Sequence, residues 1–141
     1  MTLMAKETIP CPACGLEQEI EVYQTINADI TPELVDRLFD GKINVFNCTS
    51  CGHRAFVNQP LLFNDMRKEQ KIQYFPVDWL NADIDSVCEQ YRELMAELEK
   101  FRSDFGFMAK SFREMSIHVV FYLDEMIAQI KFKRHLHDFD A

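Results

Sequence analysis

The sequence predicts an α+β fold, in which a small antiparallel β module with an inserted helix is followed by an antiparallel helical hairpin. Two Cys-x-x-Cys-Gly motifs, CPACG at residues 11–15 and CTSCG at residues 48–52, lie between segments of alternating apolar and polar residues. All five prolines fall in the first 80 residues. From residue 81 onward the apolar residues recur at helical spacing. We therefore expect a module over residues 1–80 and a helical arm over residues 81–141.

The module is expected to consist of short strands around one helix. Thr31 is placed to cap this helix, Pro32 to begin it and Gly41 to end it. The segment between Asn64 and Glu69 has the composition of a hairpin turn. Six runs have the pattern or composition of strands, namely residues 4–9, 17–26, 42–48, 53–57, 60–64 and 70–75.

Two helices are expected in the arm. Apolar residues from Ile84 to Phe105 alternate spacings of three and four, and the same pattern runs from Met108 to Met126 after a break in SDFG at 103–106. The run IHVVFYL at 117–123 has the composition of a strand, but the length of the periodic pattern favours a helix over 107–130. Folding back of the second helix would bring its basic end beside the acidic residues near 78–85.

The second helix carries more apolar surface than one partner helix can cover. Its additional apolar residues are Ile117, Val120, Phe121, Leu123, Ile127 and Ile130. Such a face must pack on the β module or on another chain. We therefore expect a protein partner or a homo-oligomer to bind through the segment from Phe107 to Ile130.

The two cysteine motifs predict a zinc site formed by Cys11, Cys14, Cys48 and Cys51. A Cys-x-x-Cys turn presents two sulfur atoms to one ion, and the glycine after it permits a tight turn with positive φ. The gap between the pairs is 33 residues, which is long for a zinc ribbon. When the helical insert at 28–41 is left out, 19 of the 33 residues between the pairs remain, which is a normal zinc-ribbon spacing. The strands that flank the insert are then expected to be neighbours.

Three other uses compete with zinc for these cysteines, namely disulfides, redox or catalytic chemistry, and iron. Disulfides do not suit a cytoplasmic chain, and catalytic or redox Cys-x-x-Cys motifs usually occur singly beside a helix. Iron in a rubredoxin-like site stays open, because the same two turns serve either metal. Four thiolates complete a tetrahedral shell and leave no position for an activated water, so a structural role is expected.

The residues around the motifs resemble those of the CpXC family of bacteria and archaea. The likeness rests on CPACG, on the segment from Ile26 to Phe63 that contains CTSCG, and on the following NDM turn. It spans residues 9–80. It implies a small cysteine-metal domain with ligands at the four cysteines, and it implies nothing about residues 81–141.

Composition and charge restrict the class of function. The net charge of −8 disfavours nucleic acid as a partner, although zinc ribbons often bind it, so a nucleic-acid-binding ribbon stays an alternative. The N-terminal residues MTLMAKETIP carry no signal-peptide pattern, and no apolar run is long enough for a membrane span, so a cytoplasmic location is expected. We find no catalytic constellation and expect a non-catalytic interaction or scaffold protein.

Five further residues were considered as functional candidates. Cys88 is expected to be a small buried thiol, and His118 a core histidine. His53 is expected to be a half-exposed strand residue beside the second motif. His135 and His137 are expected to lie at a solvated helix end, where positive charge complements the helix dipole.

Overall fold

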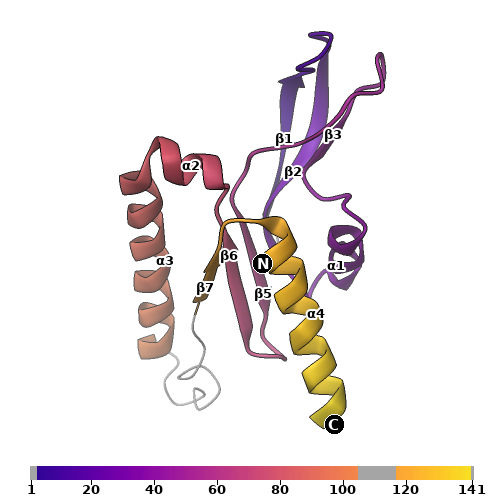
Figure 1. Ribbon diagram of the computed structural model, residues 1–141. Helices are drawn as coiled ribbons and strands as arrows, with labels where there is room; N and C mark the ends of the chain where they lie inside the picture. The colour runs from indigo at the N-terminus through magenta and orange to yellow at the C-terminus, as the bar shows by residue number, and fades with distance from the viewer. Residues whose placement is uncertain (1–2, 105–116, 141) are drawn as a thin grey trace.

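The computed structural model describes residues 3–104 and 117–140, which form an α+β fold (Figure 1). The described residues build a five-stranded sheet of order β1-β2-β5-β6-β7 and a two-stranded sheet of β3 and β4. The strands are β1 (Leu3–Pro10), β2 (Glu17–Asn27), β3 (Val45–Asn47), β4 (Arg54–Phe56), β5 (Leu61–Asp65), β6 (Gln70–Tyr74) and β7 (Ile117–Val120). The helices are α1 (Pro32–Phe39), α2 (Val77–Ala82), α3 (Ile84–Asp104) and α4 (Leu123–Asp140).

The long strand β2 belongs to two parts of the molecule. From Glu17 to Thr25 it pairs antiparallel with β1, with Leu3 opposite Thr25 and Pro10 opposite Glu17. Only its last three residues also pair with β5, in parallel. The outer half of the β1–β2 hairpin therefore projects beyond the main sheet, beside β3 and β4 (Figure 1). We call residues 7–20 and 45–57 the cysteine arm.

Helix α1 confirms the predicted insert. It begins at Pro32 after Thr31 and buries Leu34, Val35 and Leu38 in the main core. Gly41, at φ 69°, follows its C-terminal end as expected. The Thr31 hydroxyl does not cap the helix and instead donates a hydrogen bond to the Asn27 carbonyl at 3.0 Å.

The prediction of one helix over residues 107–130 is wrong. Residues 117–120 form β7, which pairs in parallel with β6, and α4 begins only at Leu123. The β-branched run Ile-His-Val-Val completes the open edge of β6, and this pairing overrides the helical spacing. Residues 105–116 of the predicted helix lie outside the described residues.

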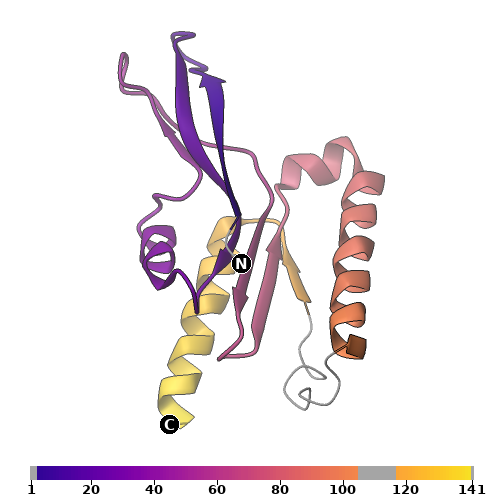
Figure 2. The ribbon, with the colours of Figure 1, turned by 180° about the vertical axis from the view of Figure 1, so that it is seen from behind.

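Helices α3 and α4 do not form the predicted helical hairpin. Figures 1 and 2 show the two helices on either side of the sheet, with β6 and β7 between them. The basic residues Lys131 and Arg134 lie over the Phe39 ring of α1, at 5.1 and 5.3 Å from its centroid, rather than beside the acidic residues near 78–85. The described chain that follows α3 enters the sheet as β7 and does not pack on α3 as a second helix.

The main core lies between the sheet, α1 and α4. Ile26, Phe63 and Ile72 are fully buried there with Met126 and Ile130 of α4. Of the additional apolar residues predicted to need covering, Ile117, Val120 and Ile130 are buried within the chain itself, and Leu123 and Ile127 are partly buried against the main core. Strand pairing and core packing both cross the boundary expected between residues 80 and 81.

Candidate metal centre

Both Cys-x-x-Cys motifs lie at the outer end of the cysteine arm. Cys11 directly follows β1, and Cys48 directly follows β3. Each motif forms the turn between two antiparallel strands, β1 to β2 and β3 to β4. Because both hairpins project in the same direction, their turns meet although they are far apart in sequence (Figure 1).

The four sulfur atoms form one compact cluster. The Sγ atoms of Cys11, Cys14, Cys48 and Cys51 all lie within 4.8 Å of one another. Two contacts join the motifs, with Sγ–Sγ distances of 3.6 Å from Cys11 to Cys51 and 3.5 Å from Cys14 to Cys48. In a tetrahedral site with metal–sulfur bonds of about 2.3 Å, neighbouring sulfur atoms are about 3.8 Å apart. The cluster has the size of such a tetrahedron.

The first turn is held by backbone hydrogen bonds. The Gly15 amide donates to the Cys11 carbonyl at 2.8 Å, and the Cys11 amide donates to the Leu16 carbonyl at 2.9 Å. The Ala13 amide points at the Cys11 sulfur at 3.4 Å. An amide directed at a thiolate stabilises the negative charge that a metal ligand carries.

The second turn repeats this pattern closely. The Gly52 amide donates to the Cys48 carbonyl at 3.0 Å, and the Cys48 amide donates to the His53 carbonyl at 2.8 Å. The Cys51 amide lies 3.5 Å from the Cys48 sulfur. Gly15 and Gly52 adopt φ angles of 78° and 75°, which explains why glycine follows each motif.

Hydrogen bonding separates the acidities of the four thiols. The hydrogen bond from the Cys51 amide lowers the pKa of Cys48 to about 6, although burial opposes it. For Cys51, the hydrogen bond from the His53 amide lowers the pKa, but burial and the three neighbouring thiols outweigh it and raise the value to about 12. Deprotonation is thus favoured at Cys48 and opposed at Cys51, and a cation at the centre of the cluster would favour deprotonation of the remaining thiols.

The cluster is sealed on one side only. Cys11 and Cys48 are 3% and 5% exposed and pack with Phe46 in a small core of their own, whereas Cys14 and Cys51 are exposed. Ile9, Ile20 and Val57 are partly buried against this core. It is separate from the main core, so little apolar burial supports the outer end of the arm.

Two amide side chains join β3 to β2, a feature that the sequence analysis missed. Asn44 accepts a hydrogen bond from the Tyr23 amide at 2.7 Å and donates to the Tyr23 carbonyl at 3.0 Å. Gln18 donates to the Asn47 carbonyl at 2.7 Å and accepts from the Thr49 amide at 3.1 Å. The strands on either side of the helical insert are thus neighbours as predicted, but side-chain amides replace the backbone ladder. Asn44 is also at φ 54°, which asparagine tolerates better than most residues.

The other candidate residues lie outside the cluster. Among the described residues, the group of possible ligands contains the four cysteines alone, and His53 is an exposed neighbour. The burial expected for Cys88 and His118 is wrong, because both are exposed: Cys88 on α3 and His118 on the edge strand β7. His135 and His137 are exposed near the end of α4, as predicted.

The fold and the cluster define an α+β protein with a four-cysteine group of the kind that binds a metal ion. The chain belongs to the CpXC family, since the model of that family, described as CpXC protein, matches residues 9–137. The resemblance seen over residues 9–80 therefore extends through β7 and most of α4. No curated protein and no solved structure matches the chain. None of the described helices has the length and hydrophobicity that crossing a membrane requires.

Proposed function

We propose that this protein is a zinc-binding, non-catalytic protein in which the metal has a structural role. The observation that carries the proposal is the convergence of four Sγ atoms within 4.8 Å from two separate hairpins. Four cysteine ligands are typical of structural zinc sites, which keep no open position for a reacting water. In this arrangement the ion fastens one hairpin of the cysteine arm to the other.

Iron at the same four thiolates is the alternative, as in rubredoxin-like electron-transfer proteins. The exposure of Cys14 and Cys51 leaves one side of the cluster open to a redox partner. Ligand type and geometry alone suit both metals. Colour separates them, because a ferric tetrathiolate absorbs visible light and a zinc tetrathiolate does not.

The test is elemental analysis of the purified protein together with its absorption spectrum. We expect one zinc per chain and no visible absorption, and a Cys14→Ser variant should lose most of the metal. Cys88→Ser is the matched control, since Cys88 is exposed and lies outside the cluster, and it should keep its zinc. Stoichiometric iron with visible absorption would replace the zinc proposal by electron transfer. A third alternative, binding of nucleic acid by the arm, predicts salt-dependent association with DNA or RNA.

A second proposed function is protein interaction, specifically self-association through the end of α4. Phe132, Leu136 and Phe139 are 65%, 39% and 81% exposed, and their spacings of four and three place them on one side of the helix. Met126 and Ile130, which face the core, lie on the other side. The exposed apolar stripe therefore lies outside the part of α4 that the core buries.

A second copy of the chain suits this stripe by charge. Lys131 and Lys133 precede its centre, and Asp138 follows it. In an antiparallel pair, Phe132 would lie near Phe139 of the partner subunit, and the basic half of one helix would oppose the acidic half of the other. So short a contact predicts a weak dimer, because stable interfaces bury on the order of 1,200 Å² or more.

Sedimentation equilibrium over a range of concentrations tests the self-association. We expect a monomer–dimer equilibrium that Phe139→Ser shifts toward monomer. Phe56→Ser is the control, because Phe56 is similarly exposed but lies on β4 in the cysteine arm. A protein that stays monomeric at every concentration, or a Phe56→Ser variant that dissociates equally, would refute this interface.

A further inference from the structure

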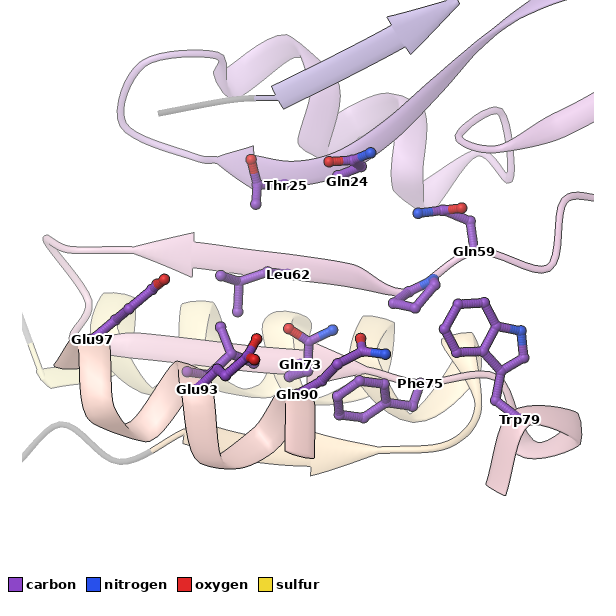
Figure 3. A pocket seen from close by; sticks show the side chains of 12 residues that line it. Gln24, Thr25, Gln59, Leu62, Gln73, Phe75, Trp79, Gln90, Glu93 and Glu97 are labelled. Carbon is purple, nitrogen blue, oxygen red and sulfur yellow. The ribbon is translucent and has the colours of Figure 1, made fainter. Parts of the chain in front are cut away.

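A cleft lies between α3 and the sheet face opposite the main core (Figure 3). Its volume is about 350 Å³. Leu62 of β5 with Gln73 and Phe75 at β6 form its floor, and α3 forms one wall. The cleft is at the main sheet, so it is distinct from the cysteine cluster at the end of the arm.

The charged groups of this cleft have one sign. Glu93 and Glu97 of α3 line it, and no lysine, arginine or histidine is among its described lining residues. Lys71 is two residues before Gln73 in β6, so the two side chains lie on the same face of the strand. The charge of Lys71 interacts with that of Glu97. Glu97 thus has an internal counter-charge nearby, whereas no described cation forms an ion pair with Glu93.

Gln73 supplies a hydrogen-bond acceptor at the floor of the cleft. It occupies a central strand position, between Leu62 of β5 and Val119 of β7, and it is 5% exposed. Its Nε2 donates to the carbonyls of Tyr74 at 2.9 Å and Leu61 at 3.4 Å, which fixes the orientation of the amide. The described residues give its Oε1 no donor. This oxygen is accessible from the cleft, so the floor offers an acceptor to a ligand that carries N–H groups.

The other end of the cleft is aromatic. Trp79 of α2 and Phe75 line it (Figure 3). Such surfaces bury aliphatic carbon, and an indole ring also attracts a nearby cation. The cleft therefore combines an apolar end, an acceptor on its floor and a negatively charged wall.

We propose that this cleft binds an organic cation, specifically an ammonium or guanidinium group on a short aliphatic stem. Glu93 supplies the counter-charge, Gln73 Oε1 accepts an N–H hydrogen bond, and Trp79 and Phe75 cover the stem. Two sources share this chemistry: a free alkylamine, or a lysine or arginine side chain of a peptide.

The protein carries its own reporter for this binding. Trp79 is the single tryptophan of the chain, and it lines the cleft. Its fluorescence is measured while the full-length, metal-loaded protein is titrated with butylamine, with doubly blocked lysine or with a short lysine-containing peptide. Butyrate and butanol are the matched anionic and neutral probes. We expect saturable changes with the cationic probes, on the order of millimolar for the smallest, and none with butyrate or butanol.

Variants on one helix locate the binding. Glu93→Gln should weaken binding about threefold to fivefold, and Glu97→Gln should weaken it less because of Lys71. Glu89→Gln, an exposed change on α3 outside the cleft, should leave the affinity unchanged. Shifts in the side-chain amide signals of Gln73, measured by NMR, give a readout independent of the fluorescence.

The outcomes are distinct. Tighter binding of butylamine than of blocked lysine and the peptide identifies a small-molecule site, and the reverse order identifies a side-chain site; both support the proposal. Equal responses to butyrate, the absence of any saturable change, or equal effects of Glu93→Gln and Glu89→Gln would overturn it.

Discussion

Removal of the metal should open the cysteine arm and leave the main sheet folded. The perturbation is a strong chelator under reducing conditions, or the Cys14→Ser substitution. The arm has only the small core of Phe46 and its neighbours, whereas the main core is a separate cluster of thirteen buried residues that includes Phe63 and Ile72. The two regions should therefore respond differently.

The magnitude follows from what holds the arm together. Burial of Phe46, which is 2% exposed, contributes about 2–3 kcal/mol, and three partly buried neighbours add about 1 kcal/mol each. A structural zinc site supplies on the order of 10 kcal/mol or more. Since the metal contribution is larger than the apolar one, the arm loses most of its stabilisation with the ion. The main core is a cluster separate from the cysteines, so it would lose no stabilisation directly.

Hydrogen exchange followed by mass spectrometry measures this difference. In peptides covering residues 9–20 and 45–57, chelation should accelerate amide exchange at least about a hundredfold, equivalent to about 3 kcal/mol. Peptides covering residues 61–74 should keep their protection. The Cys88→Ser variant should match the unaltered protein with and without chelator.

Two results would refute this reasoning. Loss of protection at residues 61–74 together with the arm would mean that the metal stabilises one cooperative unit. Unchanged protection in the arm would mean that the cluster has no structural role.

Further predictions concern the turn, the strand link and the core. Gly52→Ala should cost about 1–2 kcal/mol through its φ of 75° alone, because an added Cβ has no neighbour within 4 Å, and competition with a chelator should detect the weaker metal retention. Asn44→Ala removes the side chain that pairs with the amide and the carbonyl of Tyr23, so it should lower the free energy of unfolding by about 2–4 kcal/mol in denaturant titrations. Full stability of this variant would show that water replaces the Asn44 amide. Met126→Ala, at a fully buried position, should cost about 2–5 kcal/mol in the same titration, and the exposed control His135→Ala should stay within about 0.5 kcal/mol.

The elements predicted correctly from the sequence depend on local chemistry. The glycine after each cysteine pair forces a turn of positive φ, and Pro32 and Gly41 mark a helix through backbone restrictions of their own. These restrictions act within a few residues, so their effect can be inferred without knowledge of the surroundings. The spacing of the cysteines also predicted that the two turns would lie together.

The errors arose where the partner of a segment decides its structure. Residues 117–120 satisfy a helical spacing and a strand composition equally well, and the open edge of β6 selects the strand. The exposure of His118 follows from this choice, because β7 is the last strand of the sheet. Gln73 gave no signal in the sequence, since only its place at the centre of the sheet puts an ordinary glutamine at the floor of the cleft.

The sequence by itself determined the four-cysteine cluster, the inserted helix and most of the strands, because turn geometry and ligand spacing are local properties of the chain. The tertiary structure alone decided that the C-terminal third completes the sheet, and it placed α3 and α4 on opposite faces. The physical reason is that an apolar segment gains nearly the same burial from several partners. Its final place depends on which strand edge and which sheet face the rest of the chain leaves open.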